Sequence, residues 1–482
     1  MNFIEDVMER SKASRLGIVA IDSAGNRREW HYGELIARSA GLSGAMAARG
    51  VERGDAVMTL VGSRIEWVLA MLACFRMGAV AMPCSPQLRR KDLEIRVGAA
   101  SPKLCIGEEG LLAELPDGVP AMTMADVADA LDEDRPQETP ADMAHLEPED
   151  PAVIIFTSGT SGDPKGVLYP QRYLTGQRLQ AEHWVGARKR ELAWCTAAPG
   201  WSKSTRNVFI APWLCGAAAL MHDARFDPDE RLGIVERERV NVLCQAPTEY
   251  RILAKRTELR PCSSLRRMVS AGEPLNRDVI RAFREVMGIG IGDGYGQTET
   301  GAVSGMRPDE DDPVRDGSMG RPLPGVEARV VDGELQVRPE SVPSFFSHYL
   351  GGKPFEGEWW STGDSVRQDE DGYLWFEGRD DDIIITAGYR VGPFEVESAL
   401  VSHPAVAEAA AVPAPDEERG SVVRAIVVLA AGDPSDELAA ELQDHVKRVT
   451  APYKYPRIVE FTDELPKTPS GKIRRAELRS RE

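Results

Sequence analysis

Short apolar runs alternate with amphipathic stretches in the first part of the chain. Ala56–Leu60 and Ala79–Met82 have the length and composition of strands, and Arg64–Met77 between them has helical periodicity and ends at Gly78. A strand, a helix and a strand in this order form a βαβ unit, whose strands pair in parallel. The pattern therefore predicts an α/β domain with a parallel sheet covered by helices.

Similar short runs follow further along the chain. Val153–Phe156, Val242–Cys244 and Met268–Ser270 are apolar and are followed by glycine, turn or helix signals, so each predicts a buried strand. Ser365–Gln368 and Tyr373–Phe376 flank an Asp-Gly pair, which is typical of a β-hairpin. The large domain is therefore expected to contain mixed as well as parallel sheets.

Two stretches divide the chain into parts. Asp126–Pro151 is rich in Asp, Glu and Pro and predicts a surface connection. After Asp380–Asp382 the pattern changes to strand-like runs around one long helix, which predicts a small α+β domain. We therefore expect an N-terminal domain over residues 1–378 and a C-terminal lid over residues 379–482. The runs are Ala407–Val412, Arg424–Leu429 and Arg457–Phe461, and the helix is Asp436–Val449.

Composition narrows the choice of partners. The 482 residues carry 58 Lys and Arg against 76 Asp and Glu, a net charge of −18. This acidity disfavours general binding to nucleic acids or anionic membranes, which reward basic surfaces. The seven cysteines are scattered singly, residues 1–17 lack an apolar signal core, and the longest apolar run, Trp67–Phe75, is too short to span a membrane. A cytoplasmic protein with buried, reduced thiols is therefore expected.

A glycine-rich loop is the strongest chemical feature of the sequence. Thr157–Gly166 combines hydroxyl side chains, glycines that let the backbone approach a ligand closely, and the positive charge of Lys165. Such a loop directs N–H and O–H donors at phosphate oxygens. It differs from a Walker loop because Lys165 lies between proline and glycine. Alone, the loop predicts nucleotide binding.

Five further segments follow the loop: Ser270–Pro274, Gly294–Glu299, Ser361–Asp364, Gly378–Glu397 and Pro466–Lys472. Together with the loop, and in this order, they resemble the adenylate-forming superfamily of acyl-CoA synthetases, luciferases and peptide-synthetase adenylation domains. The stretches Gly392–Leu400, His403–Ala407 and Ala451–Pro456 make the resemblance closest to the medium-chain acyl-CoA synthetase branch. The resemblance covers nearly the whole chain.

The resemblance implies an ATP-dependent acid:CoA ligase that uses Mg²⁺. Lys472 would bridge the carboxylate and the α-phosphate, Thr298 would contact that phosphate, and Glu299 would hold the metal. Asp364 and Arg379 would bind the ribose, and Tyr295 would stack on the adenine. The remaining residues that the resemblance assigns to ATP or AMP are Thr157, Ser158, Gly159, Thr160, Ser161, Gly162, Lys165, Gly272, Glu273, Pro274, Asp293, Gly294, Gly296 and Gln297.

The second half-reaction passes the acyl group to coenzyme A. Members of this superfamily rotate the small domain between the two steps, and the resemblance makes Asp381 the hinge. Trp201 would form part of the acyl pocket, with Thr298 and Arg390 beside the substrate. Candidate contacts with coenzyme A are Gln87, Ala387, Gly388, Tyr389, Arg419, Lys447 and Tyr455.

The sequence is compatible with more than one class of carboxylic acid substrate. A short- to medium-chain acid is expected, because the segment after Trp201 is more polar than a long alkyl chain needs. Within that segment, Lys203 and Arg206 point either to solvent or salt bridges, or into a pocket for a short, polar or acid-bearing substrate. The alternative functions are an aryl-CoA ligase of benzoate type, a ligase for a pathway intermediate, an acyl-AMP ligase that loads a carrier protein, and an inactive nucleotide sensor. The intact Lys472 disfavours the sensor.

Two expectations concern partners. Lys472 lies in a glycine-containing loop, and its acetylation would remove the charge that offsets two anions. A lysine acetyltransferase or deacetylase is therefore one candidate partner. A second copy of the chain, in a homodimer, is the other.

Overall fold

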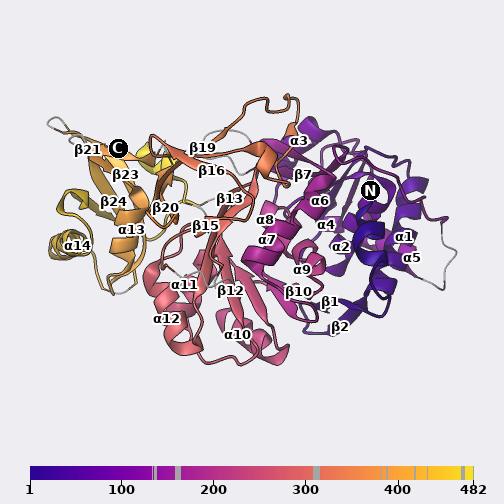
Figure 1. The fold of residues 1–482 in the computed structure, drawn as a ribbon, viewed down its shortest axis with the longest axis horizontal. Coiled ribbons are helices and arrows are strands. Elements are labelled where there is room, and N and C mark those ends of the chain that lie inside the picture. Colours follow the sequence, from indigo (N-terminus) through magenta and orange to yellow (C-terminus); the bar gives the residue numbers. More distant parts are fainter. Residues whose placement is uncertain are drawn as a thin grey trace.

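The computed structural model describes most of the chain. The described residues are 1–132, 134, 138–157, 164–307, 315–379, 382–386, 389–416, 419–430, 432–467 and 473–480. They form a large α/β domain and a small α+β domain beside it, which confirms the predicted fold class (Figure 1). No helix in these ranges is both long and apolar enough to cross a membrane.

The predicted βαβ unit lies in a seven-stranded sheet. Strand β3 (Ala56–Leu60) pairs in parallel with β4 (Val80–Pro83), and α2 (Ile65–Met77) connects them. Gly78 ends α2 in the left-handed conformation that glycine adopts without steric cost. The strand order is β18 (His348–Tyr349), β8 (Gly166–Pro170), β7 (Pro151–Phe156), β4, β3, β5 (Leu104–Gly107) and β6 (Ala121–Thr123).

A nine-stranded sheet forms the second half of the large domain. Its central strands are parallel, and β13 turns back into the antiparallel β14. The predicted strands at Val242–Cys244 and Met268–Ser270 are confirmed within β11 and β12. The order is β15 (Arg321–Pro322), β14 (Gly301–Gly305), β13 (Ile291–Gln297), β12 (Arg267–Ala271), β11 (Val242–Gln245), β9 (Leu192–Cys195), β10 (Ala218–His222), β1 (Leu16–Ile21) and β2 (Arg27–His31).

A four-stranded sheet contains the last strands of the large domain. The predicted hairpin is present, because β19 (Trp360–Gln368) pairs antiparallel with β20 (Leu374–Arg379). Strands β16 (Ala328–Val331) and β17 (Glu334–Val337) complete this sheet. The hairpin brings Asp364 and Arg379, which are distant in sequence, to directly opposite positions.

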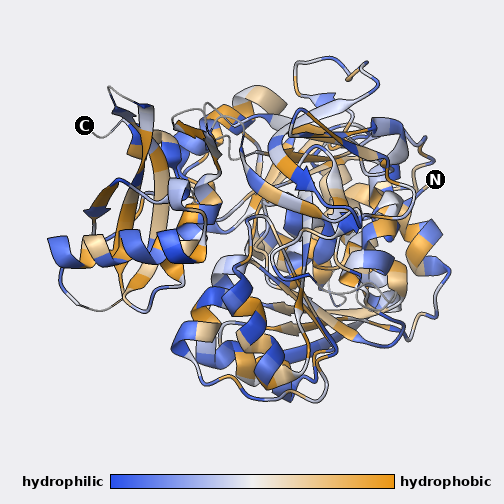
Figure 2. Ribbon diagram, turned by 60° about the vertical axis from the view of Figure 1, so that its left-hand side comes forward, coloured by the Kyte–Doolittle hydropathy of each residue, from blue (hydrophilic) through white to orange (hydrophobic). Residues whose placement is uncertain are grey.

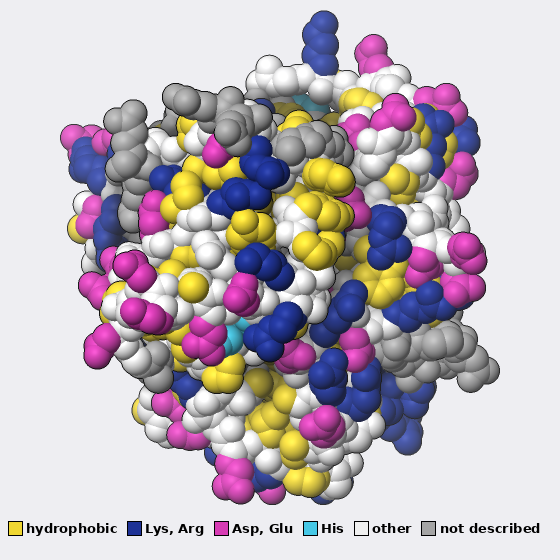
Figure 3. Space-filling model, turned by 90° about the vertical axis from the view of Figure 1, so that its left-hand side faces the viewer, with side chains coloured by type: hydrophobic (Ala, Val, Ile, Leu, Met, Phe, Trp, Pro, Cys, Tyr) yellow, Lys and Arg dark blue, Asp and Glu magenta, His cyan; other side chains and the backbone are white. Residues whose placement is uncertain are grey.

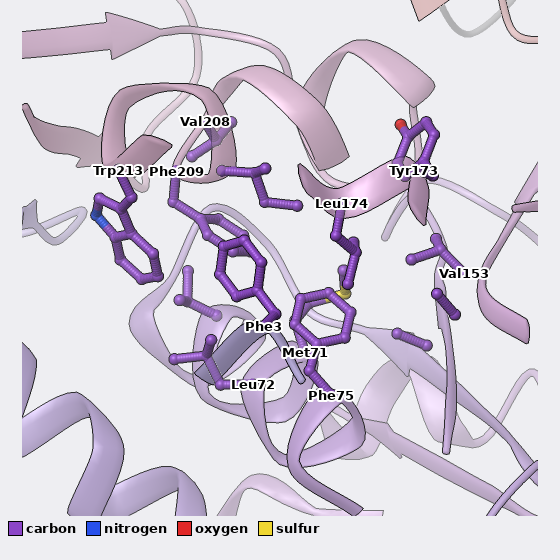
Figure 4. Close-up of a cluster of buried hydrophobic side chains, with 14 of the residues drawn as sticks. Phe3, Met71, Leu72, Phe75, Val153, Tyr173, Leu174, Val208, Phe209 and Trp213 are labelled. Carbon is purple, nitrogen blue, oxygen red and sulfur yellow. The ribbon is translucent and has the colours of Figure 1, made fainter. Parts of the chain in front are cut away.

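Helices cover the sheets and bury the core between them. In Figure 4, Phe3 and side chains of α2, such as Met71 and Phe75, meet Phe209 from the segment after α8. The helices of the large domain, besides α2, are α1 (Tyr32–Ala48), α3 (Arg90–Ala100), α4 (Glu109–Leu112), α5 (Met124–Leu131), α6 (Arg172–Gly176), α7 (Arg178–Gln180), α8 (Ser202–Asn207), α9 (Ile210–Cys215), α10 (Pro228–Arg237), α11 (Pro247–Arg256) and α12 (Arg277–Met287).

The small domain has its own apolar core. Its strands are largely hydrophobic, and its helices carry both hydrophobic and hydrophilic residues, the former contributing to the core (Figure 2). The predicted helix Asp436–Val449 is α14, with Ser435 capping its first turn and acidic residues following the cap. The other elements are β21 (Ile384–Thr386), β22 (Tyr389–Val391), β23 (Val406–Asp416), β24 (Gly420–Leu429), β25 (Ile458–Phe461), α13 (Pro393–Val401) and α15 (Arg475–Arg479).

Two sequence-based expectations need correction. Asp126–Pro151 is only partly a surface connection, because its first residues belong to α5 and its last residue begins β7. The backbone of Thr139 packs so closely on α1 that a Cβ at Gly44 would lie 2.6 Å from its carbonyl oxygen. All seven cysteines are unpaired as expected, but Cys215 and Cys262 are only half-buried.

Candidate active site

Several residues of the predicted nucleotide site lie where strands of both large sheets end. In an α/β sheet, ligands bind beyond the carboxyl ends of the strands. Thr157 follows β7, and its N–H donates to the Lys165 carbonyl at 3.0 Å, which closes the base of the glycine-rich loop. Ser158, Gly159, Thr160, Ser161 and Gly162, within that loop, lie outside the described residues.

The turn after β13 lies beside the base of this loop. Tyr169, on β8, donates from its hydroxyl to the Thr298 carbonyl at 2.6 Å. The Tyr349 hydroxyl donates to Glu299 Oε1 at 2.7 Å, and the Lys165 ammonium lies 5.4 Å from the centre of the Tyr349 ring. Burial and the charge of Glu299 raise the pKa of Tyr349, so the hydroxyl stays a proton donor. Thr298, Glu299 and Lys165 therefore share one location.

Asp364 is the centre of a buried polar cluster. Its carboxylate is 4% exposed and accepts hydrogen bonds from Tyr295 Oη, from Gln297 Nε2 at 2.9 Å and from Arg379 Nη1 at 3.1 Å. Burial raises the pKa of Asp364, while Arg379, Tyr295 and Gln297 act in the opposite direction. Arg379 is half-exposed, so its guanidinium extends from the buried Asp364 carboxylate toward the surface. A ligand that bears hydroxyl groups has a carboxylate and a guanidinium to bind here.

The segment Gly272–Pro274 follows β12. Gly272 has a positive φ of 111°, and open space surrounds the position where a Cβ would stand. The Glu273 carboxylate accepts from Thr248 and from Arg251 Nη2 at 3.2 Å. Burial opposes ionisation of Glu273, but Arg251 and Thr248 outweigh it and lower its pKa. Glu273 is thus held as an ion, and the open space at Gly272 is available to a flat ligand.

Asp293 is a buried carboxyl in β13. It is 4% exposed and accepts a hydrogen bond from the Gly294 N–H at 3.0 Å. Burial raises its pKa to about 8 against the ordinary value of 3.8, with Lys203 among the groups that oppose the rise. Asp293 is therefore protonated at neutral pH, and it is suited to donate a hydrogen bond.

This shift predicts how stability depends on pH. In the unfolded chain Asp293 loses its proton near 3.8, whereas in the folded chain it keeps the proton up to about 8. The folded state therefore binds more protons between these values, and the free energy of unfolding falls as pH rises through this window. Asp293→Asn removes that dependence, so the slope should become shallower by up to about 1.4 kcal/mol per pH unit. Urea unfolding from about pH 5 to about pH 8 measures it.

The exposed Asp117 provides the control for this measurement. Its side chain is 101% exposed, so Asp117→Asn should leave the slope as it is in the wild type. Equal slopes for Asp293→Asn and the wild type would show that Asp293 ionises normally in the folded chain.

The residues expected to contact coenzyme A are divided between the two domains. Gln87 lies in the large domain, where its N–H donates to Ser85 Oγ at 3.2 Å. In the small domain, the Lys447 ammonium lies 4.4 Å from the centre of the Tyr455 ring, and Tyr389 stacks on Tyr453 at 4.5 Å. Arg419 donates from its N–H to Asp416 at 2.8 Å.

The small domain therefore brings together only part of the predicted coenzyme A site. Hydrophobic and basic side chains adjoin on the face of the molecule seen from the small-domain side (Figure 3). Ala387, Gly388, the expected hinge residue Asp381 and the expected catalytic residue Lys472 lie outside the described residues, and so does the side chain of Arg390.

Trp201 precedes helix α8, and of the two cations that follow it Arg206 is buried and Lys203 is half-buried. Lys203 Nζ donates to the carbonyl oxygens of Gln245 at 2.8 Å and Ala271 at 3.2 Å. Arg206 is 7% exposed. Within the described ranges neither residue forms an ion pair, so the salt bridges expected for them are absent there, and Arg206 is also withdrawn from solvent.

Several supporting residues were not predicted from the sequence. Tyr169 and Tyr349 hold the Thr298–Glu299 turn, and Trp360 donates to Gln297 Oε1 at 3.1 Å. They are far from their partners along the chain, so local pattern gave no signal. Thr362 had a signal in the sequence, because it belongs to the Ser361–Asp364 segment. Its hydroxyl accepts a hydrogen bond from the Asp364 N–H at 3.2 Å.

Known proteins resemble this chain over its whole length. The family model described as AMP-binding enzyme matches residues 8–378, and the model of its C-terminal domain matches residues 395–472. An uncharacterized acyl–CoA ligase of Bacillus subtilis is 39% identical, over 100% of this chain and 96% of the relative. A mitochondrial acyl-coenzyme A synthetase of Mus musculus is 36% identical, over 100% of this chain and 90% of the relative.

A solved structure extends the likeness to three dimensions. A benzoate CoA ligase from Burkholderia xenovorans is 27% identical and has a TM-score of 0.88, with 100% of both chains covered. The family models together span most of this chain, and the acyl–CoA ligase of Bacillus subtilis aligns with all of it. The chain belongs to the AMP-binding enzyme family and is an AMP-forming acyl-CoA synthetase.

Proposed function

We propose that this synthetase activates a short- to medium-chain carboxylic acid in two steps at the site described above. In the first step a carboxylate oxygen attacks the α-phosphorus of ATP, pyrophosphate leaves, and an acyl-adenylate forms. In the second step the thiol sulfur of coenzyme A attacks the acyl carbon, AMP leaves and the thioester forms. The observation that carries the proposal is the buried Asp364, held between Tyr295 and Arg379 beside the Thr298–Glu299 turn.

The first step must overcome repulsion between two anions. At about 4 Å, two unit charges repel by roughly 4 kcal/mol at an effective dielectric constant near 20. Fixed cations and donors offset this repulsion as charge builds on the phosphate. Lys472 would supply the bridging cation, Thr298 and the glycine-rich loop would supply donors, and Lys165 adds positive charge near Glu299.

Asp364 and Arg379 would hold the ribose hydroxyls of the nucleotide. The adenine would lie between Tyr295 and the open space at Gly272. The remaining proposed nucleotide contacts come from the backbone and side chains after β12 and along β13, at Glu273, Pro274, Asp293, Gly294, Gly296 and Gln297.

Glu299 suits Mg²⁺ as a hard oxygen ligand. Within the described residues no three His, Cys, Asp or Glu side chains cluster as a metal cage. A single carboxylate is compatible with Mg²⁺, which is commonly held by one or two carboxylates together with substrate phosphates. When bound, the ion would neutralise charge on the phosphate oxygens. Tyr349 would orient the carboxylate by its 2.7 Å hydrogen bond.

Rotation of the small domain would exchange the groups at the reacting centre. We place the boundary between residues 378 and 379 and the hinge at Asp381. Asp382, directly after the hinge, pairs with Arg479 of α15 at 2.9 Å, and α15 follows the Lys472 loop. This pairing supports movement of the Lys472 loop together with the domain. Polar contacts between the domains, such as Lys255 Nζ to the Val406 carbonyl at 3.0 Å, can re-form in another orientation.

Rotation would withdraw Lys472 and bring Ala387, Gly388 and Tyr389 toward the acyl-adenylate. The pantetheine arm would then pass Gly388, and Lys447, Tyr455 and Arg419 would face the rest of coenzyme A with Gln87. The contact of Lys447 with Tyr455 supports a joint role for these two residues.

A panel of acids tests the proposed function. Purified protein with ATP and Mg²⁺ should release pyrophosphate with a subset of acids from about C2 to C12 and of benzoates, and should form acyl-CoA only when free coenzyme A is present. Because a benzoate CoA ligase is a structural relative, benzoates are included as the leading alternative. Pyrophosphate release without any thioester on free coenzyme A would indicate loading of a carrier protein instead. Binding of ATP without turnover of any acid would indicate a sensor.

Three further expectations stay proposals. The seven unpaired cysteines support a reducing, cytoplasmic location. We also propose a homodimer and control by acetylation of Lys472. Stoichiometric acetylation of Lys472 with unchanged adenylation activity would contradict the latter.

A further inference from the structure

Helix α8 is polar in sequence but buried in the structure. Ser202, Ser204, Thr205, Arg206 and Asn207 are all less than one-tenth exposed. Burying so many polar groups costs free energy unless each group finds a partner. A polar side chain of α8 that has no partner in the protein therefore indicates a place where a ligand can bind.

Arg206 has no hydrogen-bond partner within the described residues. Its Nε and Nη1 atoms are buried and make no hydrogen bond, although the side chain is 7% exposed. A buried guanidinium without a partner is destabilising by several kcal/mol, on the order found when a buried ion pair is broken. Arg231 shows the usual solution, since it is equally buried but pairs with Glu249 at 3.1 Å. Within the described residues, no acceptor is present for the Nε and Nη1 groups of Arg206.

The location of Arg206 is next to the reacting centre. A Cβ added at Gly301, shortly after Thr298 and Glu299, would lie 3.6 Å from Arg206 Nη1. Burial raises the pKa of Tyr169, and the charge of Arg206 opposes that rise. The Tyr169 hydroxyl in turn donates to the Thr298 carbonyl. The unpartnered guanidinium of Arg206 therefore lies close to Tyr169 and to the Thr298–Glu299 turn, which would hold the phosphate.

Lys203 places a second cation in the same region. Residues separated by three positions lie on one face of a helix, so Lys203 and Arg206 share a side of α8. Contact with Cys195 lowers the pKa of the Cys244 thiol, and the charges of both Lys203 and Arg206 lower it further. The two bonds of Lys203 to carbonyl oxygens leave one of its three N–H groups free to donate.

The segment after α8 fixes these cations in position. Val208 and Phe209 are buried in the core that Figure 4 shows, with Phe209 packed against Trp213 at 5.0 Å and Trp67 at 5.6 Å. A site held on a packed element keeps its geometry better than one on a loop. The cations are thus preorganised to receive an anion rather than free to move to solvent.

We propose that Arg206, with Lys203, binds a second carboxylate on the substrate, so that the preferred acids are short dicarboxylic acids. This inference rests on the proposed function and specifies its substrate class. The first carboxylate would be activated at the α-phosphate, while the second would form charge-assisted hydrogen bonds to Arg206. A guanidinium suits this role because its planar fork matches a carboxylate.

Matched pairs of acids test the proposal. Butyrate and succinate, valerate and glutarate, and hexanoate and adipate have equal carbon counts and differ in one carboxylate. The kcat/KM of the wild type, from pyrophosphate release with coenzyme A present, should favour the dicarboxylate in at least one pair by about tenfold or more. Arg206→Met should lower that ratio by about 10- to 100-fold, and Arg206→Lys should restore part of it.

Arg267→Met is the matched control. Arg267 is also buried, but its guanidinium donates to the Trp184 carbonyl at 2.6 Å and the Met306 carbonyl at 3.0 Å. Arg267→Met should lower the melting temperature without changing the ratio of kcat/KM between dicarboxylate and monocarboxylate. If Arg206→Met does not fold, the wild-type ratio and the ratio for Lys203→Met decide the matter.

Three outcomes would overturn the inference. A wild-type preference for the monocarboxylate in every pair would overturn it while leaving the proposed function intact. An Arg206→Met variant that raises the KM for ATP equally with both acids would assign Arg206 to the nucleotide. Turnover of no acid at all would overturn the proposed function together with the inference.

Discussion

Replacing Lys472 with alanine should lower acid-dependent pyrophosphate release by at least about a hundredfold while leaving thioester formation from supplied acyl-adenylate largely intact. The expectation follows from the charge balance of the first step, in which two anions must meet and one cation bridges them. In the second step the attacking group is a thiol and the phosphate is leaving, so that bridge is not needed. Pyrophosphate release and acyl-CoA formation from synthetic acyl-adenylate are measured separately.

Lys467 offers a control in the same segment. Its ammonium pairs with Glu408 at 2.6 Å, so it is engaged within the small domain. Lys467→Ala should therefore keep both half-reactions near their wild-type rates. Equal loss of both half-reactions in Lys472→Ala would contradict the assignment of Lys472 to the first step.

Replacing Asp364 with alanine should have the next largest effect. The variant leaves Tyr295, Gln297 and Arg379 without the carboxylate to which all three donate. It also removes the proposed acceptor for the ribose hydroxyls. Hydrogen bonds to a charged group contribute about 1.5 to 3 kcal/mol each, so kcat/KM for ATP should fall by about 100- to 1,000-fold. Steady-state kinetics with ATP as the varied substrate measures this.

A variant of Asp369 serves as the control that distinguishes an effect on nucleotide binding from an effect on stability. Asp369 lies in the turn of the same hairpin and pairs with Arg315 at 2.8 Å, away from the Asp364 cluster. Asp369→Ala should lower the melting temperature without raising the KM for ATP. If Asp364→Ala lowers the melting temperature as Asp369→Ala does but binds ATP normally, Asp364 is structural only.

The local elements of the fold could be predicted from the sequence, whereas their pairing could not. Periodicity located β3, α2 and α14, because burial on one face or on both leaves a regular pattern. The nine-stranded sheet places β9 between β11 and β10, and no local pattern encodes such an order. Strand order depends on contacts between residues that are distant along the chain.

In the candidate site, too, residues within local motifs could be predicted, whereas contacts between distant residues could not. The motifs predicted Asp364 and Arg379 as separate site residues, and the structure shows that they lie opposite each other across a hairpin. Tyr349 was missed because its partner, Glu299, is brought close only by folding. The burial of Arg206 was also unpredictable, because a polar run such as α8 is usually found at the surface.

Passage of the acyl group through an adenylate would leave one carboxylate oxygen on AMP, and isotope labelling detects that transfer. An accepted acid, labelled with ¹⁸O in its carboxylate, is incubated with the enzyme, ATP, Mg²⁺ and coenzyme A, and the products are analysed by mass spectrometry. If a carboxylate oxygen attacks the α-phosphorus, one labelled oxygen leaves with AMP when the thiol displaces it. Unlabelled AMP, or label in pyrophosphate or inorganic phosphate, would contradict the account.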